Sequence, residues 1–292
     1  MSEKVIKSYK GFDKDMKCRD FQYEVGKEYN MDGEIKCCNR GFHACKSPLE
    51  VWDYYDMLNS RFAEVEQSGK IDEEEKSTKV CSSHIKIKAE LKLADIINIG
   101  VEWLKNVTSP SMVKTDGALN DNGDRKKQIG SSGGSAQIGS SGDYAQIGSS
   151  GDYAQIGSSG GYAQIGSSGY SAQIGSSGDY AKIGSSGDYA QIGSSGDYAK
   201  IGSSGDSAQI GSSGGYAKID STGEDSVIMC AGNKSKAKAK IGSWITLAEW
   251  KWNDKKNRYI PVCVKTEYVD GENIKADTWY QLKKGKFVEV SE

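Results

Sequence analysis

The alternation of apolar and polar positions in the middle of the chain follows a fixed period of nine residues. From Ile129 to Val227, variants of Ile-Gly-Ser-Ser-Gly-Asp-Tyr-Ala-Gln follow one another eleven times without a gap. Within Tyr-Ala-Gln-Ile-Gly, alanine and isoleucine are two positions apart, so in a strand they share one face, with tyrosine and glutamine on the other. Ser-Ser-Gly-Asp supplies turn chemistry. The pattern predicts a β-solenoid, in which each unit buries its apolar face against its neighbours.

Two sets of substitutions predict that one turn of this solenoid holds two nonapeptides, or 18 residues. Serine replaces tyrosine in only one half of an 18-residue cycle, at Ser135, Ser171 and Ser207. Lysine replaces glutamine every 18 residues, at Lys182, Lys200 and Lys218. In this register one outward row of tyrosines is unbroken and consists of Tyr144, Tyr162, Tyr180, Tyr198 and Tyr216. On the opposite face Tyr153 and Tyr189 alternate with serines.

Other interpretations of the repeat fit its residues less well. Gly/Ser-rich sequence is typical of flexible linkers, but an unbroken isoleucine period favours an ordered stack. The calcium-binding nonapeptide pattern needs an aspartate where Gly134, Gly161, Tyr170 and Gly215 stand in four of the units. Ice-binding solenoids present flat arrays of threonine, whereas here the hydroxyls are expected in the turns and tyrosine and glutamine on the flat face.

The residues before the repeat predict an α+β domain over residues 1–107. Ser47 and Pro48 supply an N-cap and a first-turn proline for a helix over Leu49–Leu58. A second helix is expected over Leu93–Val107, where apolar residues recur at helical spacing. Strands are expected over Val5–Tyr9, within Phe21–Tyr29, and over Arg61–Val65 and Val80–Leu91, with a charged turn over Asp72–Lys76.

The remaining segments are a connector, the end of the solenoid and a cap. Residues 108–128 are polar and are expected to connect the first domain to the rod and to cap its start. The solenoid is expected over residues 129–240 and an antiparallel β cap over residues 241–292. Strands of the cap are expected over Ile245–Trp250, Tyr259–Tyr268, Trp279–Leu282 and Lys286–Val290. The fold class is therefore mainly β: a central two-sided β-solenoid between an α+β domain and a β cap.

Composition and cysteine usage narrow the cellular setting. The chain has 292 residues, of which 27% are charged and 36% apolar, enough for two or three domains. No apolar run approaches the roughly 20 residues that span a bilayer, and the first ten residues lack the apolar core of a signal peptide. Seven cysteines, an odd number, fit a reducing compartment better than a disulfide framework. We expect a cytoplasmic protein without membrane contact.

Charge is distributed unevenly along the chain. Residues 129–227 carry nine acidic and three basic residues, and residues 228–292 carry eight acidic and thirteen basic ones. An acidic rod could compete for a basic groove on another protein, and the basic C-terminal segment could touch nucleic acid. The alternative is ordinary solvated surface charge.

The outward tyrosine row is the best candidate for binding another protein. Tyrosine offers a large contact area at low entropic cost and is enriched at interfaces. The candidate partner-binding residues are Tyr144, Tyr162, Tyr180, Tyr198 and Tyr216 with Asp179, Asp197, Lys182 and Lys200. The alternative is that stacked tyrosines only stabilise the rod.

Thiols and an imidazole gather near the N-terminus. Cys18, Cys37, Cys38, His43 and Cys45 lie within 28 residues. These are ligands that zinc takes, so Cys18, Cys38, His43 and Cys45 are a candidate metal site. Their spacing does not match paired CxxC motifs, and buried thiols with a hydrogen-bonded histidine are the simpler interpretation. We expect no other cofactor.

One segment of the first domain resembles an element of ADP-ribosyltransferases. In GFHACKSPLEVWDYY a strand that ends in small residues leads into a helix with a tyrosine pair. In those enzymes such an element lies beside the nicotinamide pocket, and a later glutamate is catalytic. The resemblance implies Glu64 or Glu66 for that role, and no partner motif accompanies it elsewhere in the chain.

The two ends of the chain also resemble an uncharacterised family of bacteriophage and prophage proteins. The resemblance rests on YKGFDKDMKCRDFQYEVGKEY, GFHACKSPLEVWDYY, RFAEVE and DGENIKADTWYQLKKGKFVEV. In that family a short N-terminal domain precedes Gly/Ser-rich repeats and a β-rich tail, and no activity is assigned. The resemblance implies a phage protein in the host cytoplasm.

From that setting we expect a non-enzymatic protein that binds and inhibits a host factor, for example a nuclease-based defence complex. The alternatives are an enzyme or metal site in the first domain, and a structural or self-assembling repeat protein that forms homo-oligomers.

Overall fold

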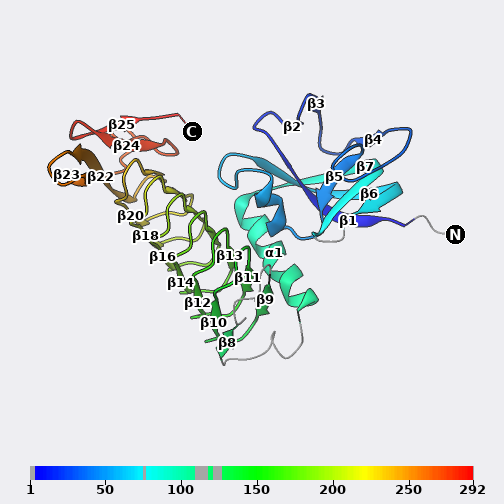
Figure 1. The fold of residues 1–292 in the computed structure, drawn as a ribbon, viewed down its shortest axis with the longest axis horizontal. Coiled ribbons are helices and arrows are strands. Elements are labelled where there is room, and N and C mark those ends of the chain that lie inside the picture. The colour runs from blue at the N-terminus through cyan, green and yellow to red at the C-terminus, as the bar shows by residue number, and fades with distance from the viewer. Residues whose placement is uncertain (1–3, 75–76, 109–117, 121–126, 292) are drawn as a thin grey trace. The chain divides into compact units, whose positions relative to one another are not determined.

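The computed structural model describes residues 4–74, 77–108, 118–120 and 127–291 (Figure 1). They divide into two compact units, with the boundary between Trp103 and Leu104. That boundary falls inside helix α1 (Leu93–Val107), which has the limits expected from the sequence. Among the described residues, no helix is long and apolar enough to cross a membrane.

The first unit is built on an antiparallel sheet with the strand order β4-β7-β5-β1-β6. The further pairing of β6 with β7 joins the two sides of this sheet, so that β7, β5, β1 and β6 form a ring. The strands are β1 (Ile6–Phe12), β4 (Glu28–Asn30), β5 (Phe42–Cys45), β6 (Arg61–Glu73) and β7 (Lys79–Leu91). A short separate hairpin consists of β2 (Lys17–Cys18) and β3 (Phe21–Gln22).

The alternating strands of the first unit enclose an apolar core and one buried polar network. Ile85 and Ile87 on β7 face Val65 on β6 and Phe12 on β1, and all four are fully buried. Gln67 is also fully buried, but Ser8 donates to its Oε1 at 2.7 Å and its Nε2 donates to the carbonyl oxygen of Phe42 at 2.7 Å. The amide is thus satisfied inside the sheet, as buried polar groups must be.

The helix expected over Leu49–Leu58 is wrong in type and length. The structure has a 3-10 helix, η1 (Leu49–Asp53), followed by turns. Tyr54 and Tyr55 both donate their backbone N–H to the carbonyl oxygen of Val51, so the helix ends in a tight turn. The strand expected over Arg61–Val65 continues instead to Glu73, and so includes the first two residues of the predicted charged turn. Pairing with β7, from Phe62 opposite Leu91 to Glu73 opposite Val80, explains that extension.

The second unit contains the predicted solenoid, with about seven turns of 18 residues (Figure 1). Its first sheet contains β8 (Ala118–Asn120), β10 (Gln137–Ser140), β12 (Gln155–Ser158), β14 (Gln173–Ser176), β16 (Gln191–Ser194), β18 (Gln209–Ser212), β20 (Val227–Cys230), β22 (Trp244–Asn253) and β23 (Arg258–Tyr268). Its second sheet contains β9 (Gln128–Ser131), β11 (Gln146–Ser149), β13 (Gln164–Ser167), β15 (Lys182–Ser185), β17 (Lys200–Ser203), β19 (Lys218–Ser221), β21 (Lys236–Lys238), β24 (Tyr280–Lys283) and β25 (Lys286–Glu289).

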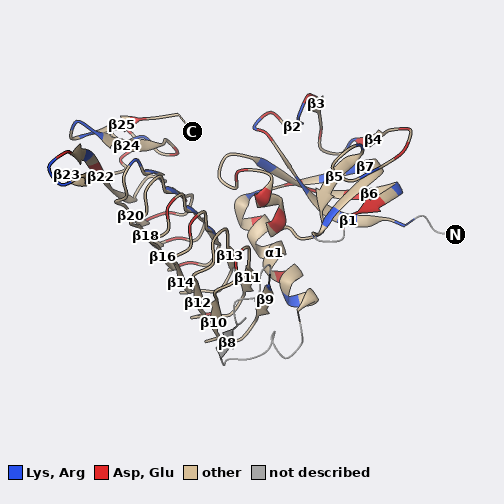
Figure 2. Ribbon diagram, in the orientation of Figure 1, with Lys and Arg blue, Asp and Glu red and all other residues tan. Residues whose placement is uncertain are grey.

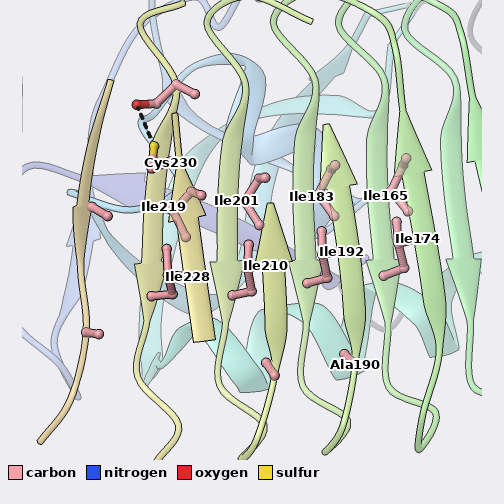
Figure 3. Close-up of a cluster of buried hydrophobic side chains, with 14 of the residues drawn as sticks. Ile165, Ile174, Ile183, Ala190, Ile192, Ile201, Ile210, Ile219, Ile228 and Cys230 are labelled. Atoms are coloured by element: carbon pink, nitrogen blue, oxygen red, sulfur yellow. Dashed lines mark hydrogen bonds between the residues drawn. The ribbon is translucent and has the colours of Figure 1, made fainter. Parts of the chain in front are cut away.

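The strands pair in parallel with each residue opposite its equivalent 18 positions later. Ile156 lies beside Ile174 in the first sheet and Ile165 beside Ile183 in the second. The isoleucines of both sheets meet in one narrow core with the alanines (Figure 3). Each buried isoleucine contributes about 1.5–3 kcal/mol, so the rod is stabilised by many similar small terms. The prediction of two nonapeptides per turn is confirmed.

The place of tyrosine within the repeat differs from the expectation. The strands consist of Gln-Ile-Gly-Ser, in which isoleucine and the first serine point inward. Tyrosine lies outside the strand, in the corner, with a left-handed backbone: φ is 58° at both Tyr162 and Tyr180. The flat faces therefore do not carry tyrosine, and the first serine of each unit is not in a turn. Alanine ends the corner, so the run Tyr-Ala-Gln-Ile-Gly never forms one continuous strand.

The C-terminal residues continue both solenoid sheets and then fold back as hairpins. β22 pairs in parallel with β20 and antiparallel with β23, and β24 pairs antiparallel with β21 and β25. All four cap strands begin within one or two residues of their predicted positions. The connector expected over residues 108–128 is described only at its ends and at β8, which pairs with β10. The rest of that prediction lies outside the described residues.

Candidate functional site

A stack of tyrosine rings runs along one edge of the solenoid, at the corners that lead from the first sheet into the second. We call Tyr144, Tyr162, Tyr180, Tyr198 and Tyr216 the tyrosine ladder. Neighbouring ring centroids are 4.8–4.9 Å apart, and the ring planes differ by 3–7°. Tyr180 is 41% exposed, and the values for Tyr162, Tyr198 and Tyr216 are similar. The ladder thus presents ring edges and hydroxyl groups outward at the spacing of the coils.

A lysine that the sequence analysis missed extends this ladder. Lys234 lies 18 residues after Tyr216 and has the same left-handed backbone, with φ 55°. Its Nζ lies 5.3 Å from the Tyr216 ring centroid and donates to the Tyr216 hydroxyl at 3.2 Å. The 18-residue spacing alone would have identified this position.

The corners hold the rings by backbone hydrogen bonds between coils. Each ladder tyrosine donates its N–H to a carbonyl oxygen 17 residues later; the Tyr180 N–H, for example, reaches the Asp197 oxygen at 2.8 Å. Ser171 and Ser207 occupy the equivalent corner position on the other edge with φ of 53° and 54°, and make the same bond. The corner backbone therefore forms equally with serine and does not require an aromatic side chain.

The opposite edge carries a second, irregular row of rings. Tyr153 and Tyr189 alternate there with serines in the sequence, but Tyr170, which occupies an aspartate position, places its ring between them. The Tyr170 centroid is 6.1 Å from that of Tyr153 and 5.2 Å from that of Tyr189, with tilted rings. Among the described rings, those of the ladder edge stack with their planes nearly parallel, whereas those of the opposite edge meet at an angle.

The candidate aspartates lie next to the ladder and connect consecutive coils. Asp179 accepts a hydrogen bond from the Asp197 N–H at 2.8 Å, and Asp197 accepts one from the Gly215 N–H at 2.6 Å. Both are exposed, so their remaining oxygens give the ladder edge a negative charge. Figure 2 shows acidic residues that recur from coil to coil along the solenoid.

The candidate lysines lie in strands, at the glutamine position of the repeat, and not beside the tyrosine ladder. Lys182 and Lys200 begin β15 and β17 and stand side by side in the second sheet, between Gln164 and Lys218. They are half-buried strand residues and do not belong to the corner that holds the ladder.

Among the described residues, the structure does not gather the four candidate metal ligands into a cluster. In the part of the chain that the structure describes, no three His, Cys, Asp or Glu side chains gather closely enough to hold an ion. The Nε2 atom of His43 instead accepts a hydrogen bond from the Cys38 N–H at 3.0 Å. Cys45 is buried, and burial raises the pKa of its thiol. Of the three thiols, Cys45 is buried, Cys18 is half-buried and Cys38 is exposed.

The same region encloses a cavity of about 640 Å³ within the first unit. Its wall includes Lys10 on β1, Cys18 at the end of β2, and Tyr54 and Tyr55 after η1. Gly11 makes this arrangement possible, because a Cβ atom there would lie 2.4 Å from the Tyr55 ring. The Tyr55 hydroxyl donates to the Cys18 sulfur at 2.9 Å.

Lys10 is the unusual group of this cavity. Its side chain is buried, and Nζ donates to the His43 carbonyl oxygen at 2.9 Å and to the Cys18 sulfur at 3.5 Å. Burial lowers the pKa of Lys10, and the Cys18 thiol opposes that shift. Burial and the nearby Lys10 also lower the pKa of His43, so the imidazole is neutral near pH 7. The sequence analysis missed Lys10; its place beside Gly11 in a short strand was the available signal.

Neither glutamate implied by the ADP-ribosyltransferase resemblance lies in the wall of this cavity. Glu64 forms an ion pair with Lys7 at 2.9 Å, and Glu66 forms one with Lys88 at 3.0 Å. Both carboxylates are thus paired with lysines of neighbouring strands.

Comparison with known proteins adds one match. A family model described as a domain of unknown function, DUF7666, matches residues 6–99. No curated protein and no solved structure matched the chain in the same comparisons. The matched range runs from β1 into α1, so the cavity belongs to the part of the chain that this domain covers, and the tyrosine ladder lies outside it.

Proposed function

We propose that this protein is a phage-type, non-enzymatic interaction protein that binds a host protein through the tyrosine ladder and inhibits it in the host cytoplasm. The phage setting rests on the resemblance of the two chain ends to bacteriophage and prophage proteins. The observation that carries the binding proposal is the coplanar, half-exposed stack of five tyrosines along one edge of the rod.

The corner backbone does not require tyrosine in order to fold. A residue with φ near +58° is disfavoured by about 1–2 kcal/mol, and Ser171 and Ser207, at φ of 53° and 54°, meet the same backbone cost, so the corner does not select tyrosine. Tyrosine nevertheless occupies this place in five consecutive coils on one edge only. An aromatic side chain that the corner backbone does not require, repeated along one edge, points to a role for that surface.

The charge beside the ladder indicates the chemistry of the partner. Asp143, Asp179 and Asp197 are interspersed with glycines along the same edge, and Lys234 stands at its end. A row of hydroxyls and carboxylates suits a partner with a basic, elongated groove. Grooves that bind nucleic acid have this chemistry, and a nuclease-based defence complex is the kind of host target we propose.

The decisive experiment compares two sets of serine variants in the full-length protein. Tyr162→Ser, Tyr180→Ser and Tyr198→Ser together remove the centre of the ladder, and Tyr153→Ser with Tyr189→Ser removes rings from the opposite edge. Because serine already occupies equivalent corners, both variants should keep the solenoid, as circular dichroism would verify. In affinity capture from host lysate, we expect the first variant to lose the protein that the wild type and the second variant retain.

The rival interpretations give different results. Capture by the ladder variant at the wild-type level would refute the ladder as the binding surface. Loss of the captured protein by both variants would assign binding to another feature of the rod. Light scattering that shows concentration-dependent oligomers, with no host protein captured, would favour a structural, self-assembling protein.

A further inference from the structure

The cavity of the first unit has the size and composition of a small-molecule site. Its volume of about 640 Å³ lies within the range of about 300–1,000 Å³ that is usual for such sites. All of its wall residues belong to the first unit, so it does not depend on the solenoid. The proposed interaction through the tyrosine ladder makes no use of it.

The interior of the cavity holds a lysine amino group without an acidic partner among the described residues. Lys10 uses two of its three donor hydrogens on a carbonyl oxygen and a thiol. Burying an ammonium group is costly unless it is paired with an opposite charge. The Cys18 thiol and the Tyr55 hydroxyl beside it are hydrogen-bonding groups rather than fixed charges. An anion bound here would give the Lys10 amino group an opposite charge and an acceptor for its third donor hydrogen.

The outer wall adds further positive charge. Arg19 and Lys79 both line the cavity, and Lys79 is paired with Glu74 at 3.1 Å, outside the lining; Asp20 is the one acidic residue among the described lining residues. Arg19 has a left-handed backbone with φ 56°, a conformation that costs free energy and is found often at binding sites. A guanidinium group is well suited to bind phosphate through two parallel hydrogen bonds.

Aromatic rings complete the wall. Phe21 is 45% exposed and Tyr54 47% exposed, although both line the cavity, and Phe21 adjoins a well-packed aromatic cluster. Lys79 Nζ lies 4.5 Å from the centroid of the Tyr54 ring, which fixes that ring on one side. Exposed rings beside a cationic cavity are typical of sites where a nucleobase stacks.

We propose that this cavity binds a nucleoside phosphate, with the phosphate held by Lys10 and Arg19 and the base stacked on Phe21 or Tyr54. Such binding requires only charge, hydrogen-bond donors and a planar apolar surface, which the wall residues supply. The site lies in the first unit, so it does not depend on the partner that the rod binds.

The test measures binding of adenosine 5′-monophosphate to the full-length protein by titration calorimetry, with the other three nucleoside 5′-monophosphates in parallel. We expect a Kd below about 1 mM for at least one nucleotide, and at least tenfold weaker binding of the corresponding nucleoside or of inorganic phosphate alone. Lys10→Met replaces the ammonium by an apolar group of similar length and should weaken the nucleotide at least tenfold. Lys70→Met, at an exposed lysine of β6 outside the cavity, should leave the Kd unchanged.

Arg19→Gln provides a second probe at a less buried position, should Lys10→Met unfold the domain. It should also weaken the nucleotide and leave the nucleoside unaffected. The proposal is overturned if none of the four nucleotides binds at about 1 mM, or if both Lys10→Met and Arg19→Gln bind with the wild-type Kd. Such a failure leaves the ladder experiment unaffected, because the variants of the two tests lie in different units.

Discussion

Two glycines three residues apart in one coil should change the stability of the protein in opposite directions when each is replaced by alanine. Gly178 lies in a corner, where a Cβ atom would lie 2.0 Å from the carbonyl oxygen of Gly160 in the preceding coil. Gly175 lies in β14, where a Cβ atom would have nothing within 4 Å. The first position is set by the close stacking of coils, and the second faces open space.

The magnitudes follow from these distances. Real Cβ atoms keep at least 3.0 Å from such oxygens, so Gly178→Ala must separate two coils by about 1 Å. Overpacking of this kind costs about 1–3 kcal/mol, and weakening the adjacent bond from the Tyr162 N–H to the Asp179 oxygen adds about 1 kcal/mol. We expect Gly178→Ala to lower the free energy of unfolding by about 2–4 kcal/mol. Gly175→Ala should raise it by about 0.4–1 kcal/mol, since it restricts the unfolded chain at no steric cost.

Urea unfolding followed by far-ultraviolet circular dichroism measures both changes in the full-length protein. Amide exchange of the corner N–H groups of Tyr162 and Tyr180 would show whether the loss is local to the altered corner. If the two variants differed from each other by less than about 0.5 kcal/mol, close stacking of the coils would not be the reason for glycine in the corners.

Three further outcomes test other parts of the structure. Tyr180→Ser removes two stacked ring pairs and should lower the free energy of unfolding in urea by about 1–3 kcal/mol. Tyr153→Ser loses one edge-to-face ring contact. Equal destabilisation by the two variants would contradict a stabilising effect of coplanar stacking in the ladder. Hydrogen bonds from Asn273, Ile274 and Glu272 lower the pKa of Asp270 to about 2. The stability that this carboxylate contributes is therefore present above its ordinary pKa near 4 and is lost as the pH falls toward 2. Exchange of the Ile274 amide should accelerate only between these two pH values. Acceleration centred at pH 4 or above would contradict the assigned hydrogen bonds. Burial raises the pKa of Cys230 to about 12, whereas Cys38 is exposed. A thiol reagent at pH 8 should therefore modify Cys38 first and Cys230 only on unfolding. If a Cys38→Ser variant kept the fastest phase of the modification reaction, this order would be refuted.

The local sequence was sufficient wherever a feature depends on the period of the chain. The nine-residue spacing of isoleucine determines the parallel stack, because only in-register coils bury every isoleucine against its equivalent. The 18-residue spacing of Lys182 and Lys200 indicates that one turn holds two nonapeptides, and in the structure the two residues lie side by side. Helix α1 and the cap strands followed from apolar periodicity in the same way.

Only the tertiary structure decided where the tyrosines and the cavity lie. The corner position of Tyr180 follows from hydrogen bonds to the next coil, which a strand-like alternation of residues does not reveal. The close spacing of Cys18, Cys38 and His43 predicts a metal site; the structure places all three in the wall of one cavity, but among the described residues no three potential ligands come close enough to hold an ion. Lys10 and Tyr55 meet at Cys18 because β1, the end of β2 and the turn after η1 fold onto one another. A periodic pattern fixes contacts between equivalent residues, whereas a site assembled from distant segments exists only after the chain has packed.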